Sequence, residues 1–289
     1  MKRLILFLLW YGFVHTAIAS SFTLLEDRID YTAGDRQIFD RYVKAMDGKK
    51  DLTMGELIIE TAKFFMETPY VASTLEKEPE QLVINLRELD CTTLVENVIA
   101  LALTIKSATP SFELFCNQLQ QLRYRKTVIN DYTDRLHYFT DWIFENSRKN
   151  LVHDMTKEIG GIPYRLNLSF MSTHPDSYRQ LKSDPALIPV IAQQEKEISA
   201  RDTYALIPEE KITDCRNGMK SGDIVCFVTQ IEGLDVSHLG FIYWQGDKLG
   251  FLHASSTAKK VIVDPRSLQE YVEGISTTTG VMIVRPADE

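Results

Sequence analysis

Residues 91–105 carry the apolar pattern that most restricts how this chain can fold. Leucine, isoleucine, valine and alanine recur there at helical spacing and occupy more than one face of the helix that they predict. A helix that is apolar on several faces must be covered from several sides, so we expect it at the centre of the molecule. Asp90 directly precedes the run and is a favourable N-cap, which would place Cys91 in the first helical turn.

Helical periodicity continues through the N-terminal half, up to about residue 155. Further helices are predicted over residues 36–46, 53–65, 111–123 and 134–146. From Asp223 the pattern changes to short runs rich in β-branched and aromatic residues. Strands are predicted over residues 223–229, 236–244, 248–254, 260–263 and 281–285, with a short helix over 265–272. A helical half followed by an antiparallel sheet is an α+β fold.

The two halves would form one domain, because each needs the other to cover its apolar face. We therefore predict a single domain over residues 20–289. The stretch 156–212 fits this pattern least, since it holds five prolines and one polar helical segment around residues 192–201. We interpret it as an insertion that crosses the surface of the domain.

The first residues have the organisation of a secretory signal peptide. Lys2 and Arg3 make a short positive segment, and residues 4–14 form an apolar run that is short for a bilayer span. Residues 17–19 read Ala-Ile-Ala, a small-x-small cleavage site. We predict a signal peptide over residues 1–19 and an exported protein, periplasmic or secreted, with an uncleaved anchor as the alternative. No later segment is apolar for long enough to cross a membrane.

Charge and cysteine content argue against several kinds of function. The formal net charge of -8 and the lack of a basic tract argue against nucleic acid as a partner. Four cysteines are too few for a disulfide framework, and their spacing matches no zinc pattern, so we expect no metal and no cofactor. In an oxidising compartment Cys215 and Cys226 could pair across a loop; the alternative is two free thiols. Cys116 lies among apolar residues and is expected to be buried.

Cys91 is the thiol best placed for chemistry. Free N–H groups and the helix dipole at the start of a helix stabilise an anion, so we expect the pKa of this thiol to be lowered. The same N–H groups could hold the oxyanion that forms when a thiolate attacks an acyl group. The alternative, from position alone, is a cysteine that packs at the helix start by chance.

A nucleophilic thiol needs a base, and a predicted hairpin brings two histidines together. Gly246 and Asp247 form a two-residue turn between two β-rich runs. Pairing outward from the turn sets Gly240 opposite His253, so His238 and His253 become diagonal neighbours on one sheet face. Gly240 leaves room there for another chain to come close. Two unrelated histidines on an open face are the alternative.

A second group of candidate residues lies in the last predicted helix of the N-terminal half. On a helix, Arg135, Tyr138 and Trp142 would share a face and could bind a sugar or the carboxylate of a peptide. The alternative is a helix that packs its aromatics into the core and leaves Arg135 on the surface. His137 and Asp141 are four residues apart on another face of this helix and have the spacing of a base and its orienting partner. Unlike His238 and His253, they do not lie on predicted strands.

Five short motifs, in this order along the chain, resemble those of the NlpC-type cysteine peptidases and amidases. They are TPYV at 68–71, LDCTT at 89–93, SGDIV at 221–225, VSHLGFIY at 236–243 and LHAS at 252–255. The resemblance implies a papain-like fold in which Cys91 is the nucleophile, His238 its base and His253 the third member of the catalytic set. It also implies that Tyr70 lines the catalytic groove.

Two longer motifs resemble a narrower branch, once a domain of unknown function and later linked to N-acetylmuramoyl-L-alanine amidase activity. They are DCTTLVEN at 90–97 and RLHYFTDW at 135–142. The resemblance implies an exported hydrolase that cleaves an amide bond in peptidoglycan-derived muropeptides, through a thioester and without a metal. The favoured bond joins N-acetylmuramic acid to L-alanine.

The chain departs from the NlpC-type pattern where substrate would be recognised. Val71, Ala72 and Ser73 replace the usual Trp-Gly-Gly, and the gap from Tyr70 to Cys91 is longer than in the stem-peptide endopeptidases. These differences argue against the γ-D-glutamyl-diaminopimelate specificity of those enzymes, so a bond within the stem peptide is the second alternative. A non-catalytic wall-binding protein, a thioesterase and an acyltransferase on the same scaffold are further alternatives.

Overall fold

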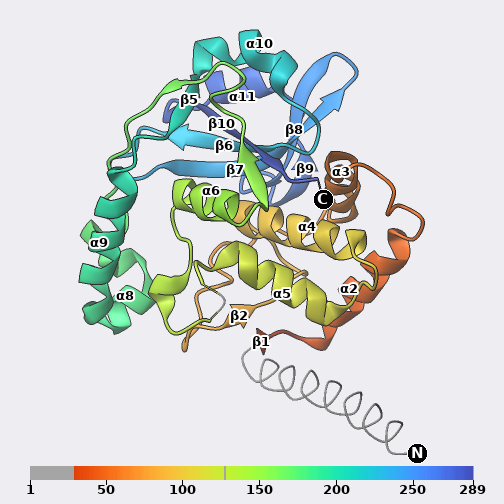
Figure 1. Cartoon of the computed structure of the whole chain (residues 1–289), viewed down its shortest axis with the longest axis horizontal. Helices are drawn as coiled ribbons and strands as arrows, with labels where there is room; N and C mark the ends of the chain where they lie inside the picture. The colour runs from red at the N-terminus through yellow and green to blue at the C-terminus, as the bar shows by residue number, and fades with distance from the viewer. Residues whose placement is uncertain (1–28, 127, 289) are drawn as a thin grey trace, which may run out of the picture.

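The structure of the chain, a computed structural model, describes residues 29–126 and 128–288. It is a mixed α/β protein with helices in the N-terminal half and an antiparallel sheet in the C-terminal half, as predicted (Figure 1). The predicted signal peptide, residues 1–19, lies outside the described residues. In the parts of the chain that are described, no helix is long and apolar enough to span a bilayer.

The N-terminal half is built mainly from helices. They are α2 (Ala33–Ala45), α3 (Met54–Phe64), α4 (Cys91–Lys106), α5 (Phe112–Arg123) and α6 (Phe139–Arg148). The first four begin where a Thr, Asp or Ser side chain accepts a hydrogen bond from the backbone N–H three residues later, so each has a local reason to start there. These four confirm the predicted helices.

Helix α6 starts later than predicted. Residues Tyr132–Asp134 form a short 3₁₀ helix, and Arg135 and Tyr138 have extended backbone, so the α-helix begins only at Phe139. Arg135 therefore precedes the helix. The predicted helical face shared by Arg135, Tyr138 and Trp142 is wrong for this reason.

Helix α4 is the central helix that its apolar pattern predicts. Every residue from 93 to 105 is buried. Helices α3 and α5 pack along it, and so do strands β7 (Val236–Gln245) and β8 (Lys248–Ser255) of the sheet (Figure 1). This packing holds the start of α4, and with it Cys91, against the sheet.

The main sheet of the described chain runs in the order β4-β5-β10-β6-β7-β8-β9, with β3 also paired to β10. Besides β7 and β8, its strands are β3 (Val152–Asp154), β4 (Ile162–Pro163), β5 (Ala205–Pro208), β6 (Ile224–Thr229), β9 (Lys260–Val263) and β10 (Thr278–Pro286). The strands predicted from Asp223 onward are confirmed. The β7–β8 hairpin has the predicted register, with Gln245 opposite Lys248 and Trp244 opposite Leu249.

Both faces of the sheet are covered by other elements. One face packs against the helical half, in a core that includes Phe241 and Leu252. The other face carries Phe227 and Phe251 and packs under α10 (Ile212–Cys215) and α11 (Leu268–Glu273) (Figure 1). The molecule therefore has three layers, with the sheet in the middle, and helix α11 confirms the short helix predicted near 265–272.

Part of the 156–212 stretch extends the main sheet. Its strand β5 pairs with β10, and β4 pairs with β5 in turn. Between these strands lie α7 (Phe170–Thr173), α8 (Arg179–Ser183) and α9 (Ile188–Ser199). The sequence predicts only a polar helix here, because β5 is four residues long and ends at Pro208. The parallel pair β1 (Ile29–Asp30) and β2 (Leu82–Val83) is likewise not predicted, since each strand has two residues.

Candidate active site

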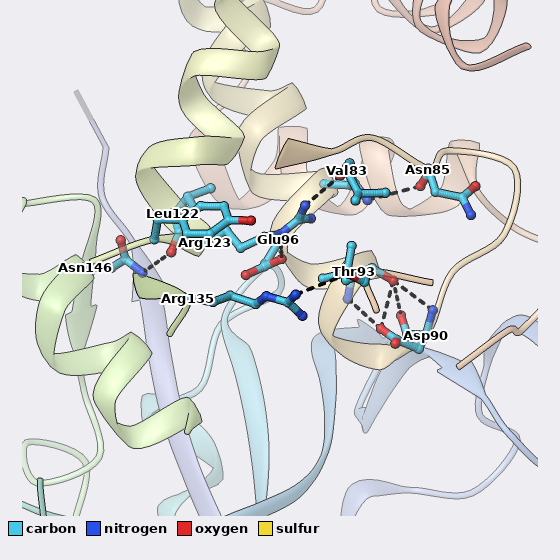
Figure 2. A network of polar contacts seen from close by, with 12 residues as sticks. Val83, Asn85, Asp90, Thr93, Glu96, Leu122, Arg123, Arg135 and Asn146 are labelled. Carbon is cyan, nitrogen blue, oxygen red and sulfur yellow. Dashed lines mark hydrogen bonds and ion pairs between the residues drawn. The ribbon is translucent and has the colours of Figure 1, made fainter. Parts of the chain in front are cut away.

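A reciprocal cap fixes the first turn of α4. The Asp90 carboxylate accepts hydrogen bonds from the backbone N–H and the hydroxyl of Thr93, both at 2.8 Å (Figure 2). The Thr93 hydroxyl oxygen accepts one from the Asp90 N–H at 2.9 Å. Such a capping box satisfies N–H groups that have no partner within the helix. It places Cys91 at the first position of α4, as predicted.

A buried ion pair ties α4 to its neighbours. Glu96 accepts a hydrogen bond from Arg123 of α5 at 2.7 Å, and both side chains are 2% exposed. A second guanidinium nitrogen of Arg123 donates to the Val83 carbonyl of β2, also at 2.7 Å (Figure 2). Because a buried charge without its partner is strongly unfavourable, these contacts hold α4, α5 and β2 in one arrangement.

The thiol of Cys91 lies close to Tyr70 and to strand β7. Leu89 exchanges backbone hydrogen bonds with the residues on either side of Tyr70, at 3.0 and 3.2 Å, which holds the tyrosine beside the start of α4. Burial, followed by the nearby charge of Cys91, raises the pKa of Tyr70 to about 12. On the other side, the backbone N–H of Leu239 lies near enough to the sulfur to oppose the rise in its pKa. Leu239 directly follows His238, so the sulfur lies next to the strand that carries this histidine.

Burial raises the pKa of Cys91 to about 12. The negative charge of Asp90 acts in the same direction, while hydrogen bonds from Leu239 and Thr92 oppose it. The shift is opposite in direction to the predicted lowering, because desolvation of the thiolate and the charge of Asp90 outweigh the hydrogen bonds to the sulfur. Near pH 7 Cys91 is a neutral thiol, which needs a base to act as a nucleophile.

The two strand histidines are in direct contact, as the hairpin pairing predicts. Nε2 of His238 lies 2.6 Å from Nδ1 of His253, and the rings meet edge to face. Gly240 makes room for this contact, because a Cβ there would come within 3.2 Å of the His253 Cβ and 2.9 Å of the Leu252 carbonyl oxygen. Burial lowers the pKa of His238 to about 3 and that of His253 to about 4, so both rings are neutral at pH 7.

Aromatic side chains enclose this pair. The ring centroids of Phe227 and His238 are 5.5 Å apart, and those of Phe251 and His253 are 4.6 Å apart. Tyr271 of α11 lies 5.7 Å from the His253 ring and 6.1 Å from the His238 ring. This apolar enclosure is the physical source of the lowered histidine pKa values.

A carboxylate beyond His253 is missing from the sequence prediction. Oδ2 of Asp264 lies 3.3 Å from Nε2 of His253, although the two atoms are poorly aligned for a hydrogen bond. Arg266 holds the same carboxylate. The sequence did hold a signal for this residue, because Asp264 directly follows strand β9, and β9 pairs with the strand that carries His253.

The remaining predicted binding residues are buried away from solvent. Arg135 is 7% exposed, and its guanidinium bonds the carboxylates of Glu76 and Glu80 at 2.7–2.9 Å. The Tyr138 hydroxyl donates to Glu195 of α9 at 2.7 Å. Trp142 is fully buried and stacks on Phe139, with centroids 4.6 Å apart. The aromatics therefore pack in the core, which agrees with the alternative interpretation of this segment, whereas Arg135 is buried rather than on the surface.

His137 and Asp141 have separate partners. His137 Nε2 lies 2.7 Å from the carbonyl oxygen of Tyr132, and Asp141 pairs with Arg125 and, at 2.7 Å, with Arg201. Both residues support the local structure, so the structure gives them no base-and-orienter geometry.

All four cysteines are within the described residues, and all are free thiols. Cys215 and Cys226 therefore do not pair, and Cys116 is buried as predicted. Among the described residues, no group of three or more His, Cys, Asp or Glu side chains is arranged to hold a metal ion.

A family model and several solved structures point to the same protein family. The model of the AmiA-like family, described as N-acetylmuramoyl-L-alanine amidase-like, matches residues 60–279. An N-acetylmuramoyl-L-alanine amidase of known structure from Bacteroides uniformis ATCC 8492 is 37% identical, with a TM-score of 0.78, over 81% of this chain and 99% of that protein. No curated protein matches this sequence.

Two further solved structures are similar. A Bacteroides fragilis protein, provisionally described as a xylanase, is 38% identical over 78% of this chain and 99% of that protein, with a TM-score of 0.74. A Legionella pneumophila protein shares the fold at 22% identity and a TM-score of 0.66, over 92% of this chain and 97% of that protein. With the family match over most of its length, the chain belongs to the AmiA-like, N-acetylmuramoyl-L-alanine amidase-like family.

Proposed function

We propose that the protein is a cysteine amidase that hydrolyses an amide bond in peptidoglycan fragments, and that the bond joins N-acetylmuramic acid to L-alanine. The observation that carries the cysteine mechanism is the 2.6 Å contact between His238 and His253, beside the residue of β7, Leu239, whose backbone N–H acts on the Cys91 thiol. Family membership supports the substrate class. The description of the Bacteroides uniformis relative as an N-acetylmuramoyl-L-alanine amidase supports the choice of bond.

In this mechanism His238 is the base. Its Nε2 contacts His253, so Nδ1 is the nitrogen left to take the thiol proton. The Cys91 sulfur attacks the carbonyl carbon of the amide, and the oxyanion is held by N–H groups at the start of α4. His238 then returns the proton to the departing nitrogen of L-alanine, which leaves the muramoyl group on Cys91 as a thioester.

Water completes the cycle. His238 accepts a proton from the water that attacks the thioester, and the thiol of Cys91 is restored when the carbon–sulfur bond breaks. The products are a muramic acid with a free carboxylate and a peptide that begins with L-alanine. Since the thiol pKa is raised and the imidazole pKa is lowered, proton transfer accompanies attack rather than preceding it.

The finer features of the fold and location belong to the same proposal. A cysteine at the start of a central helix that packs on the antiparallel strands carrying His238 and His253 supports a papain-like, NlpC-type fold in a single domain over residues 20–289, with 156–212 as an insertion. We infer that Tyr70 lines the groove beside Cys91. A wall substrate fits an exported protein, so we also propose that residues 1–19 are removed and that the enzyme acts in the periplasm or outside the cell.

Glycoside hydrolysis, suggested by the description of one structural neighbour, fits these residues less well. That reaction uses two carboxyl groups on either side of the scissile bond. Here the described site has two imidazoles in contact rather than a pair of carboxyl groups, and its one carboxylate, Asp264, is engaged by Arg266.

Product analysis tests the function. Wild-type protein and Cys91→Ala would be incubated with a defined disaccharide-peptide muropeptide, and the products identified by mass spectrometry. We expect free disaccharide and a peptide with N-terminal L-alanine from the wild type, and no turnover by the variant. Cys116→Ala, at a buried thiol in α5, is the matched control and should be active. Cleavage within the peptide would contradict the proposed bond, and turnover by Cys91→Ala would contradict the mechanism.

A further inference from the structure

Asp264 is held in a fixed orientation by Arg266. Oδ1 of Asp264 accepts hydrogen bonds from the backbone N–H and from Nε of Arg266, both at 2.9 Å. Oδ2 accepts one from Nη2 of Arg266 at 2.9 Å and lies 3.3 Å from Nε2 of His253. The carboxylate side chain is 3% exposed. The two oxygens therefore have different surroundings, and only Oδ2 faces the histidine.

The backbone around Asp264 is equally well fixed. Ile262 of β9 pairs with His253 of β8, and the Asp264 N–H donates to the Phe251 carbonyl at 3.0 Å. Three residues later Ser267 caps helix α11, which carries Tyr271. The guanidinium of Arg266 lies over the Tyr271 ring, 4.5 Å from its centroid. Asp264 thus joins the sheet to the helix that covers the histidine pair.

A single proton lies between the two histidines, and its position decides whether His238 can act as a base. If His238 Nε2 carries the proton and donates it to His253 Nδ1, then His238 Nδ1 has a free lone pair. If His253 Nδ1 carries it, a neutral His238 has its proton on Nδ1 and cannot accept one from the thiol. The two arrangements also differ at the other nitrogen of His253. Its Nε2 atom is protonated in the first arrangement and unprotonated in the second.

An ionised carboxylate distinguishes the two arrangements, because it can only accept hydrogen bonds. Burial alone would raise the pKa of Asp264, but the hydrogen bonds and charge of Arg266 outweigh burial and hold this pKa below its usual value. The ionised Oδ2 atom therefore favours the form of His253 that is protonated at Nε2. That is the form in which His238 Nδ1 is free.

We propose that Asp264 is a positioning residue that fixes the tautomers of His253 and His238 in series, so that His238 presents an unprotonated Nδ1 to Cys91. This inference rests on the proposed cysteine mechanism. Arg266 has a supporting role, since it keeps the carboxylate ionised and directs Oδ2 toward His253. The polar series at the site is then Cys91, His238, His253 and Asp264.

Asp264→Asn should reverse the tautomers of both histidines. Two N–H groups of Arg266 converge on the Oδ1 position and one on the Oδ2 position, so the amide oxygen is favoured at Oδ1, where it satisfies more donors. The amide NH₂ then takes the Oδ2 position, where it loses the bond from Arg266 Nη2 and donates to His253 Nε2. Both histidines shift to the wrong tautomer. Asp264→Ala only removes the acceptor, so it leaves the correct tautomer accessible.

The asparagine variant should therefore be worse than the alanine variant, although asparagine is the closer match in shape. We expect kcat of Asp264→Asn to fall by up to about 10⁴-fold, the loss seen for a base held in the wrong tautomer. The kcat of Asp264→Ala should fall roughly tenfold, and KM should change little in either variant, since the buried carboxylate does not touch substrate.

Asp223 provides a matched control. It is 2% exposed, and its two oxygens bond Nε and Nη2 of Arg285 at 2.8 Å, which is the same arrangement without a histidine. Asp223→Asn should lower the Tm as Asp264→Asn does and leave kcat unchanged. Equal activity of Asp264→Asn and Asp264→Ala, or an equal kcat loss in Asp223→Asn, would overturn the proposal.

Nitrogen-15 NMR of the imidazole rings tests the tautomers without any turnover. In wild-type protein we expect both His238 and His253 to be protonated at Nε2, and in Asp264→Asn both at Nδ1. A wild-type spectrum with His253 protonated at Nδ1 would overturn the proposal even if the asparagine variant does not fold. An inactive wild type with the expected tautomers would instead contradict the proposed function alone, so the two failures are distinguishable.

Discussion

Nε2 of His238 and Nδ1 of His253 are 2.6 Å apart across a diagonal of the β7–β8 hairpin. In the proposed mechanism this contact decides which nitrogen of His238 takes the proton of Cys91, because it leaves only Nδ1 available. It also gives different roles to two histidines that the sequence alone does not distinguish chemically. In the proposed mechanism His238 exchanges a proton in each turnover, whereas His253 orients the ring and stabilises its charged form.

Substitutions should separate these roles. His238→Ala removes the base, so we expect kcat to fall on the order of 10³-fold or more. An amide can accept a hydrogen bond from His238 Nε2, so His253→Asn should retain part of the activity and exceed His253→Ala. Steady-state kinetics on a muropeptide gives the comparison. An active His238→Ala beside an inactive His253→Asn would reverse the two assignments.

The reactivity of Cys91 should depend steeply on pH. Since burial raises the thiol pKa to about 12, the thiolate fraction increases throughout the neutral and alkaline range. The rate of iodoacetamide alkylation at Cys91, followed by peptide mass spectrometry, should rise from pH 7 to pH 10 without a plateau. In unfolded protein the same thiol should level off above its ordinary pKa of about 8.5. A rate in the folded protein that is constant between pH 5 and pH 9 would mean a stable thiolate–imidazolium pair.

Acid should destabilise the fold through its buried histidines. Burial lowers the pKa of His137 and His238 to about 3 and that of His253 to about 4, whereas in the unfolded chain each is about 6.5. The unfolded state therefore binds protons that the folded state does not. The stability from neutral burial is complete above pH 6.5 and is lost as pH falls toward 4. Urea unfolding at pH 7.5, 5.5 and 4.5 measures the decline.

His137→Gln is the control for this effect. Glutamine does not titrate and can still donate to the Tyr132 carbonyl that His137 Nε2 contacts at 2.7 Å. The decline in unfolding free energy between pH 6.5 and pH 4 should be smaller in this variant. Asp235 acts in the opposite direction, because burial raises its pKa, but it is present in both proteins. Parallel pH profiles for the two proteins would show that His137 does not contribute.

The buried pair beside α4 should be important for stability. Glu96→Gln leaves the Arg123 guanidinium buried without its carboxylate, which should lower the unfolding free energy by about 3–5 kcal/mol. Glu60→Gln removes a surface pair with Lys49 and should change it by less than about 1 kcal/mol. Urea denaturation of both variants at one pH gives the comparison, and equal effects would mean that the Glu96 pair does not lock the helices.

Local signals made most of the fold predictable. Side-chain caps at Thr53, Asp90 and Ser111 mark helix starts in the sequence, and the two-residue turn at Gly246 fixed the hairpin register and hence the histidine contact. Strand β5 was not predictable, because a four-residue strand is recognised mainly by its partner β10, far along the chain.

The parts of the site that were mispredicted depend on tertiary burial. The helix N-terminal position of Cys91 is visible in the sequence, but the desolvation that raises its pKa arises from tertiary packing around the thiol. Asp264 lies outside the motifs of the family resemblance, and only the pairing of β8 with β9 brings it to His253.

The most direct test of the account is the identity of the acyl group carried by Cys91 during turnover. Wild-type protein would be mixed with a disaccharide-peptide muropeptide, quenched in acid within the first turnovers, and analysed by intact and peptide mass spectrometry. The account predicts an adduct with the mass of the muramoyl disaccharide, located on the peptide that contains Cys91 and absent from Cys91→Ala. An adduct with the mass of a stem-peptide fragment, or full turnover by Cys91→Ala, would contradict it.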